Sequence, residues 1–128
     1  MAAKPFTFSA VASLPPDDGQ PDGNRDLTAS GSFTHKQEAE LKISGAGTTV
    51  VGFGTIPATG AKLVIVDYEI TTPADPPINI LINGGVVGIP ISAGGGMAIS
   101  SPNPTGAGIT ALSIVATGAG TVKVTLLA

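Results

Sequence analysis

The side chains best suited to catalysis are few in this chain. His35 is the only histidine and there is no cysteine, so an activated nucleophile would have to be a serine paired with that one imidazole. The Gly-x-Ser-x-Gly turn that exposes such a serine in one large class of hydrolases does not occur. We therefore interpret His35 as a surface or locally hydrogen-bonded residue, and we predict that the chain is not an enzyme.

Two groups of carboxylates would have chemistry available to them if they were suitably placed. Asp67 and Glu69 are two residues apart, so on a strand they point to the same side and could work as an acid and base pair. We favour the alternative that they form the solvated side of that strand. The second group offers oxygen ligands for Ca²⁺ and consists of Asp17, Asp18, Asp22, Asn24 and Asp26. Its spacing differs from the loop pattern that surrounds one ion, so we predict an acidic loop, with a structural cation as the alternative and no cofactor elsewhere.

The glycine-rich strings share with phosphate-binding loops only their composition. The segment 54–62 ends in Lys62, but Ala61 stands where such a loop needs a glycine before the lysine. No helix is predicted after it to direct a dipole at a phosphate. We interpret these glycines as turn residues.

Charge and hydrophobicity exclude further classes of partner. The net charge is −3, and the six Lys and Arg are scattered along the chain, whereas a nucleic-acid surface needs them clustered. No apolar run reaches the roughly 18 residues of a membrane-spanning helix, and the first residues lack the apolar core of a signal peptide. We predict no nucleic-acid partner and no membrane insertion, and we expect synthesis in the cytoplasm.

The elements that must position these side chains are β-strands. The chain of 128 residues contains 18 Gly and 11 Pro, which interrupt it too often for long helices. Charged residues make up 12%, about half the usual share of roughly 25%. Four Phe, one Tyr and no Trp leave Val, Ile, Leu and Ala to fill the core. These features predict one all-β domain, an antiparallel β-sandwich of jelly-roll or related topology.

Alternation and turn residues predict eight to ten short strands. Residues 62–70 separate by type, with Val64, Val66, Tyr68 and Ile70 on one side and Asp67 and Glu69 on the other. The Asn83-Gly84 pair favours a tight primed turn in a hairpin, because both residues readily adopt positive φ. The remaining segments predicted as strands are 6–14, 48–53, 78–82, 86–91, 97–100 and the two arms of a closing hairpin, 109–117 and 121–127.

The region between residues 27 and 43 has two interpretations. Ala39, Leu41 and Ile43 alternate with charged residues, which favours a strand with one solvated side. A capping-box pattern beginning at Thr34 is compatible with a short helix, and we favour the strand. The Pro-, Asp- and Gly-rich residues before it predict an extended N-terminal arm over 1–26, followed by the sandwich over 27–128.

The most unusual feature of the sequence is a long stretch without charged residues. Residues 76–122 contain no Asp, Glu, Lys, Arg or His although they are rich in Gly, Ser, Thr and Asn. Since a solvated sheet normally carries charge on its outer side, we predict that another protein covers part of this surface. The alternative is a monomer that hides the apolar residues in its own core. The residues predicted to contact a partner are Phe6, Phe8, Pro15, Pro16, Ile78, Ile80, Ile82, Val86, Ile89, Ile91 and Met97.

The order of these segments resembles that of small β-sandwich virion proteins of tailed bacteriophages, in particular head decoration or cement proteins. The resemblance lies in an N-terminal arm, then Ser44-Gly45-Ala46-Gly47-Thr48, Gly60-Ala61-Lys62-Leu63-Val64-Ile65, the segment 78–91 around Asn83-Gly84-Gly85, the turn 94–96 and the closing segment 109–127. It covers most of residues 40–128 and is a pattern of strands and turns.

The resemblance implies a function in assembly. It implies a jelly-roll protomer, commonly a homotrimer, that sits on the outer capsid surface and stabilises the shell by bridging major capsid protein subunits. The alternatives are a glycan-binding module of a tail fibre and a neck or tail connector. Glycan sites usually need exposed aromatic rings, and this chain has few.

Overall fold

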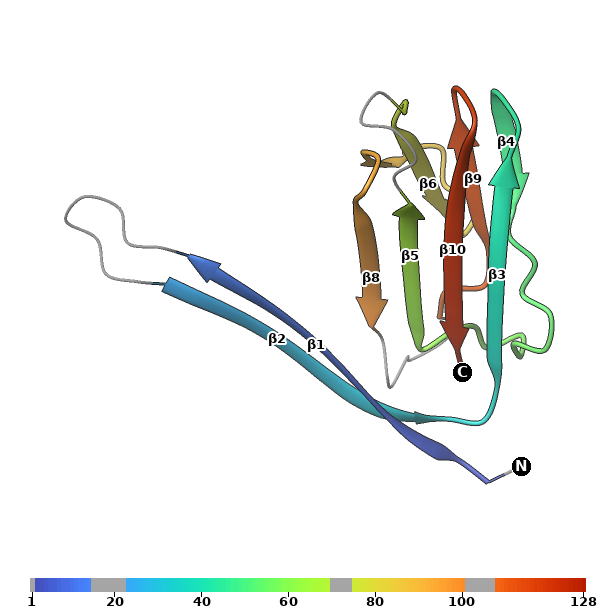
Figure 1. The fold of residues 1–128 in the computed structure, drawn as a ribbon. Helices are drawn as coiled ribbons and strands as arrows, with labels where there is room; N and C mark the ends of the chain where they lie inside the picture. Colours follow the sequence, from blue (N-terminus) through green and yellow to red (C-terminus); the bar gives the residue numbers. More distant parts are fainter. Residues whose placement is uncertain (1, 15–22, 70–74, 101–107) are drawn as a thin grey trace.

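The computed structural model describes residues 2–14, 23–69, 75–100 and 108–128, and these form strands without any helix (Figure 1). All of the strand pairs are antiparallel. The strands are β1 (Lys4–Leu14), β2 (Gly23–Phe33), β3 (Lys36–Ile43), β4 (Gly47–Val50), β5 (Leu63–Glu69), β6 (Ile78–Ile82), β7 (Ile89–Ile91), β8 (Gly96–Ser100), β9 (Leu112–Ala116) and β10 (Gly120–Leu127). The prediction of an all-β, antiparallel fold is confirmed.

The strands form three sheets. One is the two-stranded ribbon β1-β2, and the other two have the orders β3-β10-β5-β8 and β4-β9-β6-β7. These four-stranded sheets face each other in a sandwich-like body, and the ribbon extends away from it (Figure 1). The first four strands of the body pair in reverse order with the last four, as β3 with β10, β4 with β9, β5 with β8 and β6 with β7.

One aliphatic core lies between the two facing sheets. Ile80 and Ile114 from one sheet meet Val64 and Val124 from the other, and each is at most 1% exposed. Full burial of a side chain of this size contributes about 1.5–3 kcal/mol. The core is therefore the structural reason for the alternation seen in the sequence.

The predicted separation of apolar and charged residues onto opposite sides of segment 62–70 is confirmed within β5. Val64, Val66 and Tyr68 are buried and Asp67 is exposed. Ile70 lies outside the described residues. The inward side of this strand is thus apolar and its outward side carries the charge.

The uncertain region before residue 43 consists of strands, as we favoured. In β3 the exposed residues Glu38 and Glu40 alternate with the half-buried Ala39 and Leu41. The predicted domain boundary after residue 26 lies inside β2, which pairs with β1 over its whole length. The sequence of β2 has no strong alternation, so its start is not visible without its partner strand.

The predicted hairpin at Asn83 forms, but its second strand is shorter than expected. Asn83 and Gly84 have φ angles of 51° and 74°, and the Gly85 N–H donates to the Ile82 carbonyl over 2.9 Å, which is a primed turn. The strand predicted from Val86 begins only at residue 89. Asn83 Oδ1 accepts hydrogen bonds from the N–H groups of residues 110 and 111 at 2.8 and 3.1 Å. The turn is therefore hydrogen-bonded to the segment before β9, and residues 86–88 do not continue the pairing of β6 with β7.

The predicted closing hairpin over 109–127 is wrong. Strand β9 pairs with β4 and β6, whereas β10 pairs with β3 and β5 in the opposite sheet. The turn at residues 117–119 therefore crosses from one sheet to the other. A Gly-rich turn between two apolar strands permits both connections, and the pairing with distant strands decides between them.

Candidate functional site

The charged side chains of the strands of the body lie on one of its two outer surfaces. Strands β4, β6, β7 and β9 contain no charged residue. The charged residues of the other sheet alternate with its core residues and face outward from β3, β5 and β10. They are Lys36, Glu38, Glu40, Lys42, Asp67, Glu69 and Lys123. We call this surface the charged face, and the outer surface of β4-β9-β6-β7 the uncharged face.

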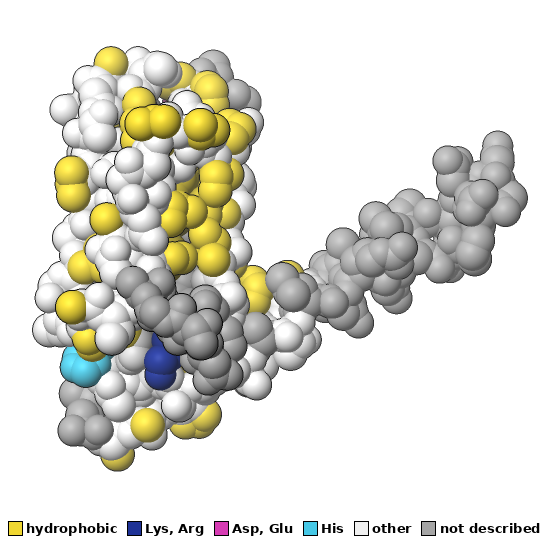
Figure 2. Space-filling view, turned by 180° about the vertical axis from the view of Figure 1, so that it is seen from behind, with side chains coloured by type: hydrophobic (Ala, Val, Ile, Leu, Met, Phe, Trp, Pro, Cys, Tyr) yellow, Lys and Arg dark blue, Asp and Glu magenta, His cyan; other side chains and the backbone are white. Residues whose placement is uncertain are grey.

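The uncharged face is built from cross-strand rows of aliphatic and small polar residues. Leu81, Ser113 and Val50 are register partners across β6, β9 and β4. In the next row Asn79, Val115 and Thr48 are partners in the same way. Because their strand neighbours fill the core, these residues point outward. Figure 2, which views this side, shows mostly hydrophobic and other uncharged side chains, with Lys or Arg and His appearing only toward the lower end of the body and no Asp or Glu on the described surface.

The most exposed large hydrophobic residues lie on this sheet and on its β6–β7 connection. Val86 is 92% exposed, Val87 85% and Val50 72%. Ile89, at the start of β7, is 42% exposed. Ile89 is the register partner of the core residue Ile80, so it lies on the inner side of the sheet at its edge. Scattered single valines are normal on a protein surface, but three highly exposed valines on one uncharged sheet and its β6–β7 connection are a feature often found at protein contacts.

The residues predicted to contact a partner lie in several different environments. Val86 is exposed on the β6–β7 connection, and Ile89 is exposed at the start of β7 opposite the core residue Ile80. Ile82 and Met97 are half-buried against the core. Pro15 and Pro16 lie outside the described residues. The prediction was wrong for the most buried members of the set, which are Ile78 (2% exposed), Ile80 (0%) and Ile91 (5%).

The error has a simple physical origin. In Ile78-Asn79-Ile80-Leu81-Ile82 both sides of the strand contain apolar residues, and we took the richer side as the contact surface. The side with more apolar residues packs in the core, because more apolar area is buried in that arrangement. The outward residues of β6, β9 and β4 were missed, although the polar Asn79 was a signal for the outward side.

Phe6 and Phe8 contact their own chain. Phe6 is buried with Leu63 and Leu127, and Phe8 and Phe33 pack around them. The rings of Phe6 and Phe33 have centroids 6.4 Å apart and an interplanar angle of 48°. These aromatic residues thus join the ribbon to the charged face of the body.

The described part of the chain shows the surroundings of His35 and of the possible metal ligands. Thr34 Oγ1 lies 2.9 Å from His35 Nδ1, which agrees with a locally hydrogen-bonded histidine. Among the described residues, no group of three His, Cys, Asp or Glu could hold a metal ion. The acidic group at 17–26 falls in the segment 15–22 and on side chains of β2 that are not described.

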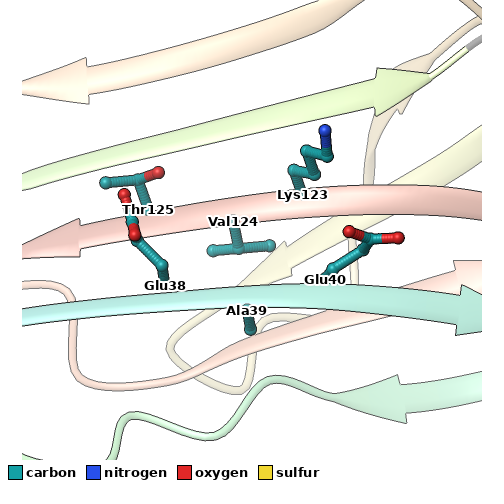
Figure 3. A pocket seen from close by; sticks show the side chains of 6 residues that line it. All are labelled: Glu38, Ala39, Glu40, Lys123, Val124 and Thr125. Carbon is teal, nitrogen blue, oxygen red and sulfur yellow. The ribbon is translucent and has the colours of Figure 1, made fainter.

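Two carboxylates of the charged face, Glu38 and Glu69, form ion pairs with lysine. Lys123 Nζ lies 2.6 Å from Glu69 Oε1, and the hydrogen bond and charge of Glu69 raise the Lys123 pKa, with smaller contributions from Glu40 and Asp67. A shallow depression on this face is lined by residues of β3 and β10, and Figure 3 shows Glu38, Glu40 and Lys123 rising on the same side. Glu69, one of the two carboxylates considered as an acid and base pair, is thus ion-paired with Lys123.

Tyr68 is unavailable for stacking on a sugar. It is 1% exposed, and its hydroxyl donates to the Pro76 carbonyl over 2.7 Å. Burial and, to a smaller extent, the charge of Asp75 raise the Tyr68 pKa above its ordinary value of 10.0. The residue on which a glycan site would most depend therefore belongs to the core.

We expect Tyr68 to ionise at higher pH in the folded protein than in the unfolded one. As the pH rises above 10.0, the unfolded state loses the phenol proton first, so folding stability falls. The chain contains one Tyr and no Trp, so absorbance near 295 nm reports this group alone. Equal titration midpoints in buffer and in urea would contradict the burial of the phenol.

Comparison with protein-family models, curated protein sequences and solved structures gave no match to the chain. The described residues contain no helix long and apolar enough to cross a membrane.

Proposed function

We propose that the chain is a non-enzymatic structural protein of a virion, a capsid decoration or cement protein on the outer capsid surface. In this proposal the uncharged face packs against major capsid protein subunits and bridges them. The observation that carries the proposal is the segregation of charge, which leaves a whole sheet surface aliphatic and uncharged. A surface of this kind gains free energy when a second protein covers it.

The strand pairing supports the jelly-roll part of the proposal. Jelly rolls are two-sheet folds of eight strands, and the body has eight strands whose first four pair with its last four in reverse order. In a fold wound in this way, consecutive strands repeatedly change sheets. The orders β3-β10-β5-β8 and β4-β9-β6-β7 contain that alternation.

The chemistry of the uncharged face favours a protein partner. It offers aliphatic groups such as Val50, with Val86 on the adjoining connection, beside hydroxyl and amide groups, and its four strands contain no Lys or Arg to bind phosphate. Individually weak contacts over such an area become strong when symmetry repeats them, and a homotrimer on a shell would supply that repetition. Binding by area requires no reactive group.

The proposal is tested by binding to capsids. We expect the chain to bind saturably to capsids of its own virion that were prepared without it, as measured by co-sedimentation. Val50→Lys should weaken this binding at least tenfold, because the buried lysine would lack a partner charge. The matched control is Thr125→Lys on the charged face, where Thr125 lies opposite Glu38, and it should bind within twofold of the unchanged chain.

Two results would count against the proposal. One is no binding to the capsid, and the other is equal weakening by both lysine substitutions. Binding to an isolated neck or tail assembly in place of the shell would replace decoration with the connector alternative.

A further inference from the structure

The ribbon leaves the body from a well-defined root. Phe6 and Phe33 pack on Leu63 and Leu127, and Lys62 Nζ donates to the Ser32 carbonyl over 2.9 Å. The backbone N–H groups of residues 34 and 35 donate to the carbonyl of residue 128 at 2.7 and 2.9 Å. Folding of the body therefore sets the direction in which the ribbon begins.

Beyond this root the two strands have only each other as extensive partners among the described residues. Each strand has 11 residues and spans roughly 35 Å at about 3.3 Å per residue. Thr7, Ser9, Ala10, Thr28 and Ser30 are exposed. A two-stranded ribbon is marginally stable by itself in water, so this length of paired strand indicates that something else supports it.

No strand of the described residues pairs with the outer edge of β1. After Pro5, β1 contains no Lys, Glu or Pro, the residues that normally discourage pairing along an edge. Two edges of the body are protected: β3 alternates charged residues along its length, and β7 has Pro90 at its centre. The other two, β4 and β8, have neither charge nor Pro.

The backbone of β8 has free groups at the required positions. The Tyr68 N–H donates to the Gly95 carbonyl over 2.9 Å, and hydrogen-bonded pairs alternate along an antiparallel ladder. With the register Val66↔Met97, the backbone groups of Met97 therefore face β5. The N–H and C=O groups of Gly96, Ala98 and Ser100 point to the outer edge, where no described strand pairs with them.

We propose that β1 of one copy pairs with the free edge of β8 in a second copy, so that ribbons are exchanged between copies. The chain itself contains both halves of this contact, an uncharged open strand on a ribbon and an uncharged open edge on the body. The ribbon extends away from its own body (Figure 1), so its open strand is presented to a neighbour.

The size of the ribbon fits this occupant. β8 has five residues and β1 has eleven, so β8 can pair along its whole length with one part of β1. Reciprocal exchange or a closed ring would use every ribbon and every β8 edge, as symmetric assemblies require. The proposal extends the proposed function, but it concerns contact between copies and its test needs no capsid.

The test uses the absence of cysteine in the chain. One population carries Ser9→Cys and an isotope label, a second carries Ala98→Cys without label, and the two are refolded together. A short bismaleimide should link labelled to unlabelled chains, as read by mass spectrometry. The matched control pairs Ser9→Cys with Thr125→Cys, which lies on the same sheet but two strands away from β8, and should give at least fivefold less product.

A second pair of variants tests the backbone contact. Ala98→Pro removes an N–H from the free edge and should weaken self-association at least tenfold in sedimentation equilibrium. Ala98→Val keeps that N–H and should change association less than twofold. A monomeric unmodified chain, or equal crosslinking to position 125, would overturn ribbon exchange. If either result occurred while the chain still bound capsids, only ribbon exchange would be rejected and the proposed function would be retained. If the chain self-associated but did not bind capsids, only the proposed function would be rejected.

Discussion

Replacing Ile114 with Ala is expected to lower the free energy of unfolding by about 4 kcal/mol. Ile114 is 0% exposed at the centre of β9, between the two facing sheets. Truncation removes buried methyl groups and leaves a cavity, because strands on both sides are held by backbone hydrogen bonds and cannot close onto it. Urea denaturation followed by circular dichroism measures the change.

The neighbouring residue supplies the control for this prediction. Val115 follows Ile114 in the same strand but points to the uncharged face, opposite Asn79 and Thr48. We expect Val115→Ala to cost about 1 kcal/mol or less in the isolated chain, since little cavity forms at a partly solvated site. Equal losses from the two substitutions would show that we have assigned the inner and outer sides of β9 incorrectly.

Replacing Gly60 with Ala is expected to lower the free energy of unfolding by about 3 kcal/mol. Gly60 has a φ of +92°, and a Cβ at this position would lie 2.8 Å from the Ile109 carbonyl oxygen. That carbonyl accepts the Ala61 N–H over 2.8 Å, so moving it away breaks the contact between residue 61 and the segment before β9. The added methyl therefore combines backbone strain with a steric clash.

Gly52 is the matched control for Gly60. Its φ is not positive and a Cβ added to it would meet no atom within 4 Å, so Gly52→Ala introduces neither strain nor clash. We expect a change within about 0.5 kcal/mol, or slight stabilisation through the less flexible unfolded chain. Thermal unfolding of both variants by circular dichroism separates the two sites, and equal midpoints would contradict the strained conformation of Gly60.

The two stability predictions bear on the proposed function through the rigidity of the body. Ile114 supports the uncharged face from beneath, and Gly60 ties the start of β5 to the segment before β9. A face that binds by area must keep its shape before contact, since ordering it on binding would reduce the affinity. Both variants should therefore weaken capsid binding only in proportion to the fraction of unfolded chain.

Several features of the fold could be predicted because they depend on neighbours in the sequence. The alternation in residues 62–70 identified the buried side of β5, since side chains on a strand change sides at each residue. The positive φ angles at Asn83 and Gly84 followed from the tolerance of these two residue types for that conformation. The absence of charge in residues 76–122 drew attention to the sheet that forms most of the uncharged face.

Other features could not be predicted because they depend on contacts between distant segments. The connection between β9 and β10 joins two sheets, and only their pairing with β4, β6, β3 and β5 shows it. The start of β2 became visible only through its pairing with β1, because its own sequence alternates weakly. Backbone hydrogen bonds are alike for all residue types, so the sequence carries little information about which distant strand a given strand selects.

By itself the sequence determined that this protein is all-β, that its core is aliphatic and that its second half lacks charge, since composition and two-residue periodicity are local properties. Only the tertiary structure decided which side of an apolar strand faces inward. Ile78 and Ile80 lie in the core and Leu81 lies on the outer side, because this arrangement buries the larger apolar area against the facing sheet. The position of the candidate site therefore depends on which side of each apolar strand is buried, and the residue types alone do not decide this.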